Sequence, residues 1–140
     1  MAGELLLDTG ALVSLLDRSQ NQHLNCVTFF RQWEGPVVSS EAILTEAMHL
    51  LGSVRGGWTA CLDFFLRGAA TLVPSTQMSL RRCQELIQKY QDLPMDYADA
   101  TLVTLAEDLR TNLIFTTDRK DFSVYRIHGR GSFEILPEAS

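Results

Sequence analysis

Short apolar runs alternate with segments of helical periodicity along this chain, and that alternation constrains the fold more than any other feature. The runs are Leu5–Leu7, Val37–Val38, Thr71–Val73, Leu113–Thr116 and Phe133–Leu136, and each has the length of a buried strand. Between them, apolar residues recur at the spacing of a helix face. Because parallel strands are joined by helical crossovers, the pattern predicts a three-layer α/β/α sandwich around a mostly parallel sheet of about five short strands.

The predicted helices lie between these runs, and several begin at residues that favour helix ends. They cover residues 11–16, 21–33, 41–51 and 58–66, a segment after Ser75-Thr76, and residues 94–109. Ser39 or Ser40 can cap the third of them, and Pro94 suits the first turn of the last. In the second helix, Leu24, Val27 and Phe30 are expected to face the core, with Phe29 as a further candidate.

The length of 140 residues is typical of one compact domain, and no repeat, linker or low-complexity tract divides the chain. A single domain over residues 1–140 is therefore expected. Cys26, Cys61 and Cys83 stand far apart and match no zinc-ligand spacing, so they are expected to be reduced core residues. The N-terminal segment lacks the basic start of a signal peptide, and its apolar run ends at Asp8, which predicts a cytoplasmic protein without a membrane anchor.

Two aspartates directly follow apolar, strand-like runs. Asp8 ends the sequence LLLD and Asp118 ends LIFTTD, so both are expected at the carboxyl end of a strand, the edge where open α/β sheets bind ligands. Each also has a structural interpretation, Asp8 as the N-cap of the next helix and Asp118 as a turn residue ahead of Arg119-Lys120. Taken singly, neither residue distinguishes a binding role from a structural one.

Two further acids interrupt apolar helix faces. Glu46 is surrounded by apolar residues of its helix, and Asp99 begins another apolar stripe. Desolvation strongly penalises a carboxylate at such a position unless it meets a cation. Asp96 lies one helical turn before Asp99, so the two carboxylates can face the same point. Glu41, in the first turn of the Glu46 helix, is interpreted as structural because an acid there complements the helix dipole.

The predicted site comprises Asp8, Glu46, Asp99 and Asp118, with Asp96 and Asp121 as auxiliary ligands. Its donors are all carboxylate oxygens, which favour Mg²⁺ or Mn²⁺ over zinc or copper. Such ions polarise phosphates and assist in-line displacement, so the set favours phosphodiester cleavage. In this hypothesis Asp8 and Asp118 bridge or bind the ions. Asp99 completes the coordination, and Glu46 binds a second ion or orients water.

The chain resembles a PIN domain, and particularly the VapC-like toxins of bacterial and archaeal toxin–antitoxin pairs. The resemblance rests on three pieces in order, LLLDTGALVSLLD, SSEAILTEAMHLL and MDYADATLVTLAEDLRTNLIFTTDRKDFSVYR. It implies that Asp8, Glu46, Asp99 and Asp118 occupy the family's acidic positions, that Asp96 and Asp121 are common additions, and that Thr9 and Thr117 support the pocket. It also implies RNA cleavage with Mg²⁺ or Mn²⁺, a homodimer, and an antitoxin that fills an apolar groove and places a basic side chain in the acidic pocket.

The charge distribution says less about function than the acids do. The net charge of −5 argues mildly against binding a polyanion, because affinity for nucleic acid comes mostly from Lys and Arg. Arg119 and Lys120 directly follow Asp118, where they would hold RNA phosphates beside the acids. Exposed basic side chains are also common on soluble proteins, which is the competing interpretation of both residues.

Two other functions stay open beside the leading prediction of a metal-dependent endoribonuclease, the toxin of a toxin–antitoxin pair. A carboxylate phosphatase also places an Asp after its first strand, but the DTG sequence after Leu7 lacks the second Asp of the haloacid-dehalogenase pattern. A non-catalytic RNA-binding PIN module would keep the acids without holding a metal productively.

Overall fold

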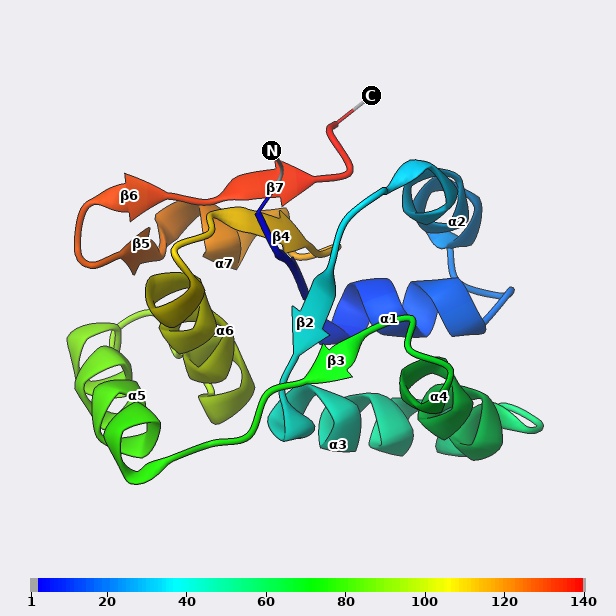
Figure 1. Ribbon diagram of the computed structural model, residues 1–140, viewed down its shortest axis with the longest axis horizontal. Coiled ribbons are helices and arrows are strands. Elements are labelled where there is room, and N and C mark those ends of the chain that lie inside the picture. The colour runs from blue at the N-terminus through cyan, green and yellow to red at the C-terminus, as the bar shows by residue number, and fades with distance from the viewer. Residues whose placement is uncertain (1–2, 140) are drawn as a thin grey trace.

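The computed structural model describes residues 3–139 and contains a five-stranded sheet between layers of helices (Figure 1). The strands are β1 (Leu5–Leu7), β2 (Val37–Ser39), β3 (Thr71–Leu72), β4 (Leu113–Phe115) and β7 (Glu134–Leu136). They lie in the order β3-β2-β1-β4-β7, and every neighbouring pair is parallel. All their carboxyl ends therefore meet at one edge, and the predicted α/β/α sandwich is confirmed.

Helices connect these strands and cover both faces of the sheet. They are α1 (Thr9–Leu16), α2 (His23–Gln32), α3 (Glu41–Leu50), the 3₁₀ helix η1 (Leu51–Ser53), α4 (Gly57–Leu66), α5 (Gln77–Lys89), α6 (Tyr97–Leu109) and α7 (Arg119–Val124). Figure 1 shows α5 and α6 on one side and α1, α2 and α4 on the other. α3 contacts α1, α4 and α6, so it joins the two helical layers. Within residues 3–139, no helix is long and apolar enough to cross a membrane.

The central strand β1 explains why the sheet needs helices on both faces. Leu5, Leu6 and Leu7 are all fully buried, so the core receives side chains from both faces of this strand. An unbroken apolar strand is typical of a parallel sheet that is covered on both sides. Burying each leucine contributes roughly 1.5 to 3 kcal/mol to folding. The run LLL thus fixes β1 in the centre and leaves Asp8 as the first polar residue at its end.

The start of α6 differs from the prediction. The helix begins at Tyr97, whereas Pro94 lies in the preceding turn instead of the first helical turn. The reason is the cap, because the Asp96 side chain accepts a hydrogen bond from the N–H of Asp99 at 2.8 Å. The helix therefore starts at the acids themselves, which places both carboxylates at its N-terminal end.

Two other segments depart from the sequence prediction. Leu24 is 78% exposed and does not face the core, because α2 turns Phe29 inward instead, with its ring centroid 4.9 Å from that of Phe115. The short helix α7 and an antiparallel hairpin of β5 (Arg126–Ile127) and β6 (Gly131–Ser132) were not predicted. Both are too short for a hydrophobic period to reveal them.

A buried ion pair ties the hairpin to the α5–α6 layer. Glu107 of α6 is only 7% exposed, and its two oxygens accept hydrogen bonds from Arg82 of α5 at 2.8 and 2.9 Å. The His128 N–H also donates to Glu107, at 2.7 Å. Burial acts to raise the pKa of Glu107, but the hydrogen bonds from Arg82 and His128 lower it below its ordinary value. This acid is therefore structural, with its charge fully matched.

We expect Arg82→Met to lower the free energy of unfolding by about 3 kcal/mol, because it leaves the buried Glu107 carboxylate without its cation. Urea denaturation measures the change. Arg81→Met is the matched control, since Arg81 is exposed and has no ion pair among the described residues, and it should cost less than about 0.5 kcal/mol. Equal losses for both variants would contradict a structural role for the pair.

Candidate active site

Asp8 stands at the carboxyl end of the central strand and is almost fully buried, with 7% of its surface exposed. It occupies the N-cap position of α1, yet its side chain makes no capping hydrogen bond. Instead its Oδ2 accepts a hydrogen bond from the Thr116 hydroxyl at 2.6 Å. The helix-cap interpretation therefore does not explain this aspartate, and the carboxylate is aimed across the sheet edge toward β4.

Asp118 lies at the same edge of the sheet, in the loop between β4 and α7, and β4 is a neighbour of β1. Its Oδ1 caps α7 by accepting from the Asp121 N–H at 3.1 Å. Its own N–H donates to the Thr116 hydroxyl oxygen at 2.9 Å. Thr116 therefore donates to one acid and accepts from the backbone of the other, and this single side chain fixes the spacing of Asp8 and Asp118.

Glu46 approaches the edge from α3. Its Oε1 accepts a short hydrogen bond of 2.5 Å from the Thr9 hydroxyl in the first turn of α1, so the predicted support by Thr9 has a direct contact. The start of α3 is anchored in turn to α6, because Ser40 caps α3 and its hydroxyl lies 2.8 Å from that of Thr101. Since Thr101 donates its proton to the Ala98 carbonyl, Ser40 is the donor between the two hydroxyls.

Asp96 and Asp99 enter from the N-terminal end of α6. Asp96 is exposed and uses Oδ1 to cap the helix, whereas Asp99 is half-buried. The Asp99 Oδ2 accepts a hydrogen bond of 2.9 Å from the hydroxyl of Tyr125. Tyr125 is 1% exposed and packs edge-on against Phe122, which holds its hydroxyl in place. Tyr125 and Thr116 are not among the predicted site residues, although both lie inside the sequence motif that carries Asp118 and Asp121.

Each of these carboxylates is held through one oxygen. The bonded oxygens are Oδ2 of Asp8, Oε1 of Glu46, Oδ1 of Asp96, Oδ2 of Asp99 and Oδ1 of Asp118. The second oxygen of Glu46, Asp96 and Asp99 accepts no hydrogen bond from any described residue. The Asp8 carboxylate also interacts with the Thr9 N–H, and the Asp118 carboxylate with the Asp121 side chain. The hydrogen bonds therefore orient the side chains and still leave carboxylate lone pairs available to a cation.

The acids act on one another electrostatically. Burial, followed by the charges of Asp118 and Glu46, raises the pKa of Asp8 to about 6 against the hydrogen bond from Thr116. Burial and then the charge of Asp96 raise the pKa of Asp99 to about 7, and Asp8 and Asp118 add to the effect. The pKa of Asp121 is also raised, by burial and then by Asp118, with a smaller contribution from Asp96. These interactions connect all six predicted acids in one network.

The donor chemistry of this network fits a hard divalent cation. Oxygen-only donors favour Mg²⁺ or Mn²⁺, and a cation would relieve the repulsion that raises the pKa of Asp8 and Asp99. Within residues 3–139, however, no three acidic, histidine or cysteine side chains already stand in an arrangement that would hold a metal ion. Donor chemistry and charge therefore point to a cation, and the described side chains do not by themselves form a coordination sphere.

The remaining predicted residues lie around this centre. Thr117 is exposed and makes no hydrogen bond to a carboxylate among the described residues, so the supporting contacts belong to Thr116 and Thr9. Arg119 donates to the Pro137 carbonyl at 2.8 Å, which holds the guanidinium near the end of β7. Lys120 is exposed beside it. The Lys120 charge acts to lower the pKa of Asp121, and a role of the two cations in holding phosphates stays a prediction.

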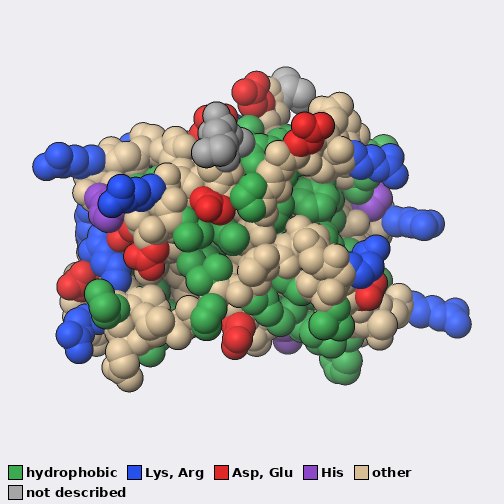
Figure 2. Space-filling view, viewed as in Figure 1, with side chains coloured by type: hydrophobic (Ala, Val, Ile, Leu, Met, Phe, Trp, Pro, Cys, Tyr) green, Lys and Arg blue, Asp and Glu red, His purple; other side chains and the backbone are tan. Residues whose placement is uncertain are grey.

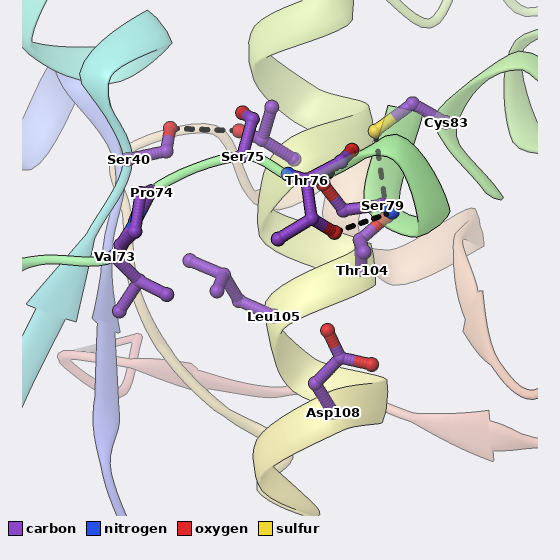
Figure 3. Close-up of a pocket in the computed structure, with 11 residues that line it drawn as sticks. Ser40, Val73, Pro74, Ser75, Thr76, Ser79, Cys83, Thr104, Leu105 and Asp108 are labelled. Carbon is purple, nitrogen blue, oxygen red and sulfur yellow. Dashed lines mark hydrogen bonds between the residues drawn. The ribbon is translucent and has the colours of Figure 1, made fainter. Parts of the chain in front are cut away.

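A separate pocket of about 250 Å³ lies between the β3–α5 loop and α6 (Figure 3). Its lining is mostly apolar but includes the hydroxyl groups of Ser40, Ser75 and Thr104, and Figure 3 shows Asp108 at one end. None of the six predicted acids lines this pocket. Its floor includes the hydrogen bond between Ser40 and Thr101, so we assign it a structural role in docking α3 on α6.

Comparison with known proteins gives consistent relatives. The PIN domain family model matches residues 5–127. Ribonuclease VapC26 of Mycobacterium tuberculosis (strain ATCC 25618 / H37Rv) is 29% identical over 135 residues, which cover 95% of this chain and 100% of that protein. The likeness to this relative thus extends over nearly the whole chain.

Solved structures share the fold. VapC20 of Mycobacterium tuberculosis, a sarcin–ricin loop cleaving toxin, has a TM-score of 0.77 at 15% identity and covers 83% of this chain and 91% of its own. A toxin–antitoxin complex from Klebsiella pneumoniae has a TM-score of 0.66 at 19% identity, with 86% and 91% covered. VapBC2 from Rickettsia felis, bound to a DNA fragment from its promoter, has a TM-score of 0.64 at 15% identity, with 94% and 98% covered.

We expect the metal-free protein to lose stability as the pH rises from about 4 to about 7, because Asp8 binds its proton more tightly in the folded chain than in the unfolded one. This contribution favours folding below the ordinary pKa of 3.8 and is lost as the pH passes about 6. Asp8→Asn should raise the free energy of unfolding at about pH 8 by up to about 3 kcal/mol, because each tenfold change in proton affinity corresponds to about 1.4 kcal/mol.

Chemical denaturation with and without Mg²⁺ measures both effects. Mg²⁺ should stabilise the unsubstituted protein at about pH 8 and have less effect on Asp8→Asn. Glu41→Gln is the control, since Glu41 is an exposed acid on the same helix as Glu46. A stability that does not depend on pH, together with a destabilised Asp8→Asn variant, would show that Asp8 is not held against charge repulsion.

Proposed function

This chain belongs to the PIN-domain family, and from that premise we propose that it is an endoribonuclease that cuts RNA with bound divalent cations. The observation that carries the proposal is the set of carboxylates at the carboxyl edge of the sheet, which hydrogen bonds orient and whose charges act on one another. The name of the relative VapC26, a ribonuclease aligned over 95% of this chain, supports RNA as the substrate. The single domain over residues 1–140 would carry the whole activity.

The proposed mechanism assigns Asp8, Asp99 and Asp118 to metal binding, with Asp96 and Asp121 as auxiliary ligands. Bound Mg²⁺ or Mn²⁺ would polarise the scissile phosphate, favour deprotonation of the attacking water and offset charge on the leaving oxygen. Glu46 would bind a second ion or orient the water. Thr116, Thr9 and Tyr125 would act as positioning residues, because their hydroxyls bind the carboxylates and leave the outward oxygens free.

Charge favours approach of RNA from the ends of the molecule. Figure 2 shows Lys and Arg side chains projecting mainly toward the two ends of the face in view, with hydrophobic side chains between them. Arg119 and Lys120 stand beside the acids and would contact phosphates on either side of the cut bond. The net charge of −5 then reflects acids gathered partly in one site, which bound cations would neutralise.

The two rival functions are less well supported. A phosphatase would use Asp8 as a nucleophile, but Asp8 is 7% exposed and one of its oxygens is occupied by Thr116. A non-catalytic RNA-binding module gives no reason for Asp99 to be half-buried, where burial and neighbouring carboxylates raise its pKa. Hydrolysis of p-nitrophenyl phosphate without RNA cleavage would favour the first rival, and metal-independent RNA binding without cleavage the second.

We expect purified protein to cleave RNA in the presence of Mn²⁺ or Mg²⁺ and to stop when EDTA is added. Glu46→Gln should lower kcat by about 100-fold or more, because it removes a carboxylate charge from the site while keeping the size of the side chain. Cleavage of labelled RNA, followed by gel electrophoresis at several metal concentrations, measures the effect.

The matched control is Glu41→Gln, which changes an exposed acid five positions earlier on the same helix and should leave kcat unchanged. Thermal unfolding of both variants should stay close to that of the unsubstituted protein. Cleavage that persists in EDTA, or equal activity of the two glutamine variants, would rule out the proposed mechanism.

We also propose an antitoxin partner, because several structural relatives were solved as toxin–antitoxin complexes. An apolar groove of about 620 Å³ between α1, α2 and α4 offers a surface for it. Leu16, Val27 and Phe30 line its floor, and Arg31 and Arg67 stand on its rim. Such a groove suits an amphipathic helix with acidic residues flanking its apolar face. A homodimer, also implied by the family resemblance, stays a proposal that light scattering can test.

We expect Val27→Asp to prevent binding of a small protein encoded beside this gene, because it places a charge in the apolar groove. Co-expression followed by affinity purification measures the loss. Leu80→Asp is the control, since Leu80 is 46% exposed on α5, outside the groove, and should leave binding intact. Retention of the partner by Val27→Asp would place the antitoxin elsewhere.

A further inference from the structure

Two hollows adjoin the acids on the α2 side and form one groove. The first, of about 310 Å³, is lined by Gly10, Ser14, Gln20, Asn21, Gln22 and Thr117, among others. The second, of about 250 Å³, is lined by Gln22, Asn25, Thr116, Thr117 and Arg119, among others. Because Gln22 and Thr117 line both hollows, the two are continuous. We call this surface the amide groove, after its four Asn and Gln side chains.

The amide groove adjoins a residue that positions the predicted acids. Thr116 lines it and is the residue that donates to Asp8 and accepts from the Asp118 N–H, although none of the six acids lines either hollow. Gly10 and Thr117 meet at the junction so closely that a Cβ at position 10 would lie 2.2 Å from the Thr117 hydroxyl oxygen. Glycine thus lets α1 approach the β4–α7 loop closely at this end of the groove.

The amide side chains stand on a well-anchored segment and are free to bind. The His23 ring nitrogen lies 2.7 Å from the Ser14 carbonyl, which ties the segment to α1. Gln20 is committed to Asp17, to which it donates at 3.0 Å. Asn25 makes only a long contact of 3.3 Å with Gln22, and Gln22 does not cap α2 although it occupies the N-cap position.

The polar groups in the groove are mostly uncharged. The first hollow has no charged residue in its lining among the described residues, and the second has one guanidinium, from Arg119, and one carboxylate, from Glu138. Asn and Gln offer both donors and acceptors in one plane, which matches the edge of an unpaired base. An uncharged amide does not repel the phosphates of an RNA chain, whereas a further carboxylate beside the predicted acids would.

We propose that the amide groove binds unpaired nucleotides next to the cleaved bond and recognises their base edges through Asn21, Gln22 and Asn25. This inference rests on the proposed nuclease function and adds the recognition of individual bases to it, since the bases of unpaired RNA are open to side chains. Arg119, which lines the second hollow with Thr116, then contacts a neighbouring phosphate. The groove decides which sequence is cut, and the acids perform the cut.

The test replaces Asn21, Gln22 and Asn25 together by alanine. All three are exposed, so the thermal unfolding temperature should not change. Gln32→Ala is the matched control, because Gln32 is an exposed amide at the other end of α2, outside both hollows. Two quantities are measured: the dissociation constant for fluorescein-labelled single-stranded RNA in EDTA, and the sequences cut from an RNA pool with randomised positions around the cleavage site.

We expect the triple variant to bind RNA roughly tenfold more weakly, since one good base contact is worth a factor of that order. Its KM should rise more than its kcat falls, and its preference among flanking nucleotides should flatten, whereas Gln32→Ala should match the unsubstituted protein. Unchanged affinity and unchanged preference in the triple variant would overturn the groove while leaving the nuclease proposal intact. If the unsubstituted protein binds RNA without cutting it and the triple variant binds more weakly, the groove is supported and the nuclease proposal is overturned. If the unsubstituted protein neither binds nor cuts RNA, both proposals are overturned.

Discussion

Repulsion among carboxylates at one edge of the sheet is the constraint that the rest of the site has to satisfy. The parallel order of β1 and β4 brings Asp8 and Asp118 to the same edge, and α3 and α6 add Glu46 and Asp99. Hydroxyl groups from Thr9, Thr116 and Tyr125 donate hydrogen bonds to these acids and so offset part of the free energy of their repulsion and burial. The donors come from three separate segments, so the acids are held only when those segments have docked together.

Burial alone does not distinguish a functional acid from a structural one in this protein. Glu107 and Asp8 are equally buried, at 7% exposure, yet their pKa values move in opposite directions. Arg82 matches the charge of Glu107, whereas the neighbours of Asp8 are themselves carboxylates. The informative quantity is the charge that surrounds the buried group, and a buried acid among other acids is typical of a functional site.

The sheet and its main helices could be predicted from the sequence because apolar runs such as LLL and LIF report burial on both faces. The acids could be located for a related reason, since each interrupts or ends an apolar pattern. The residues that hold them could not be found in this way. Thr116 lies within a predicted strand and Tyr125 follows a helix too short to show a period, and their roles depend on partners more than 20 positions away in the sequence.

Asp96 and Asp118 each begin a helix with one oxygen and present the other to the site. The same two side chains thus cap helices and would bind an ion. Because coupling between two such roles is reciprocal, an ion that fixes these carboxylates would also stabilise the first turns of α6 and α7. The helix α7 spans only residues 119–124 and depends heavily on its cap. In the proposed mechanism, metal binding would therefore also stabilise the segment that carries Arg119 and Lys120, the side chains proposed to contact RNA phosphates.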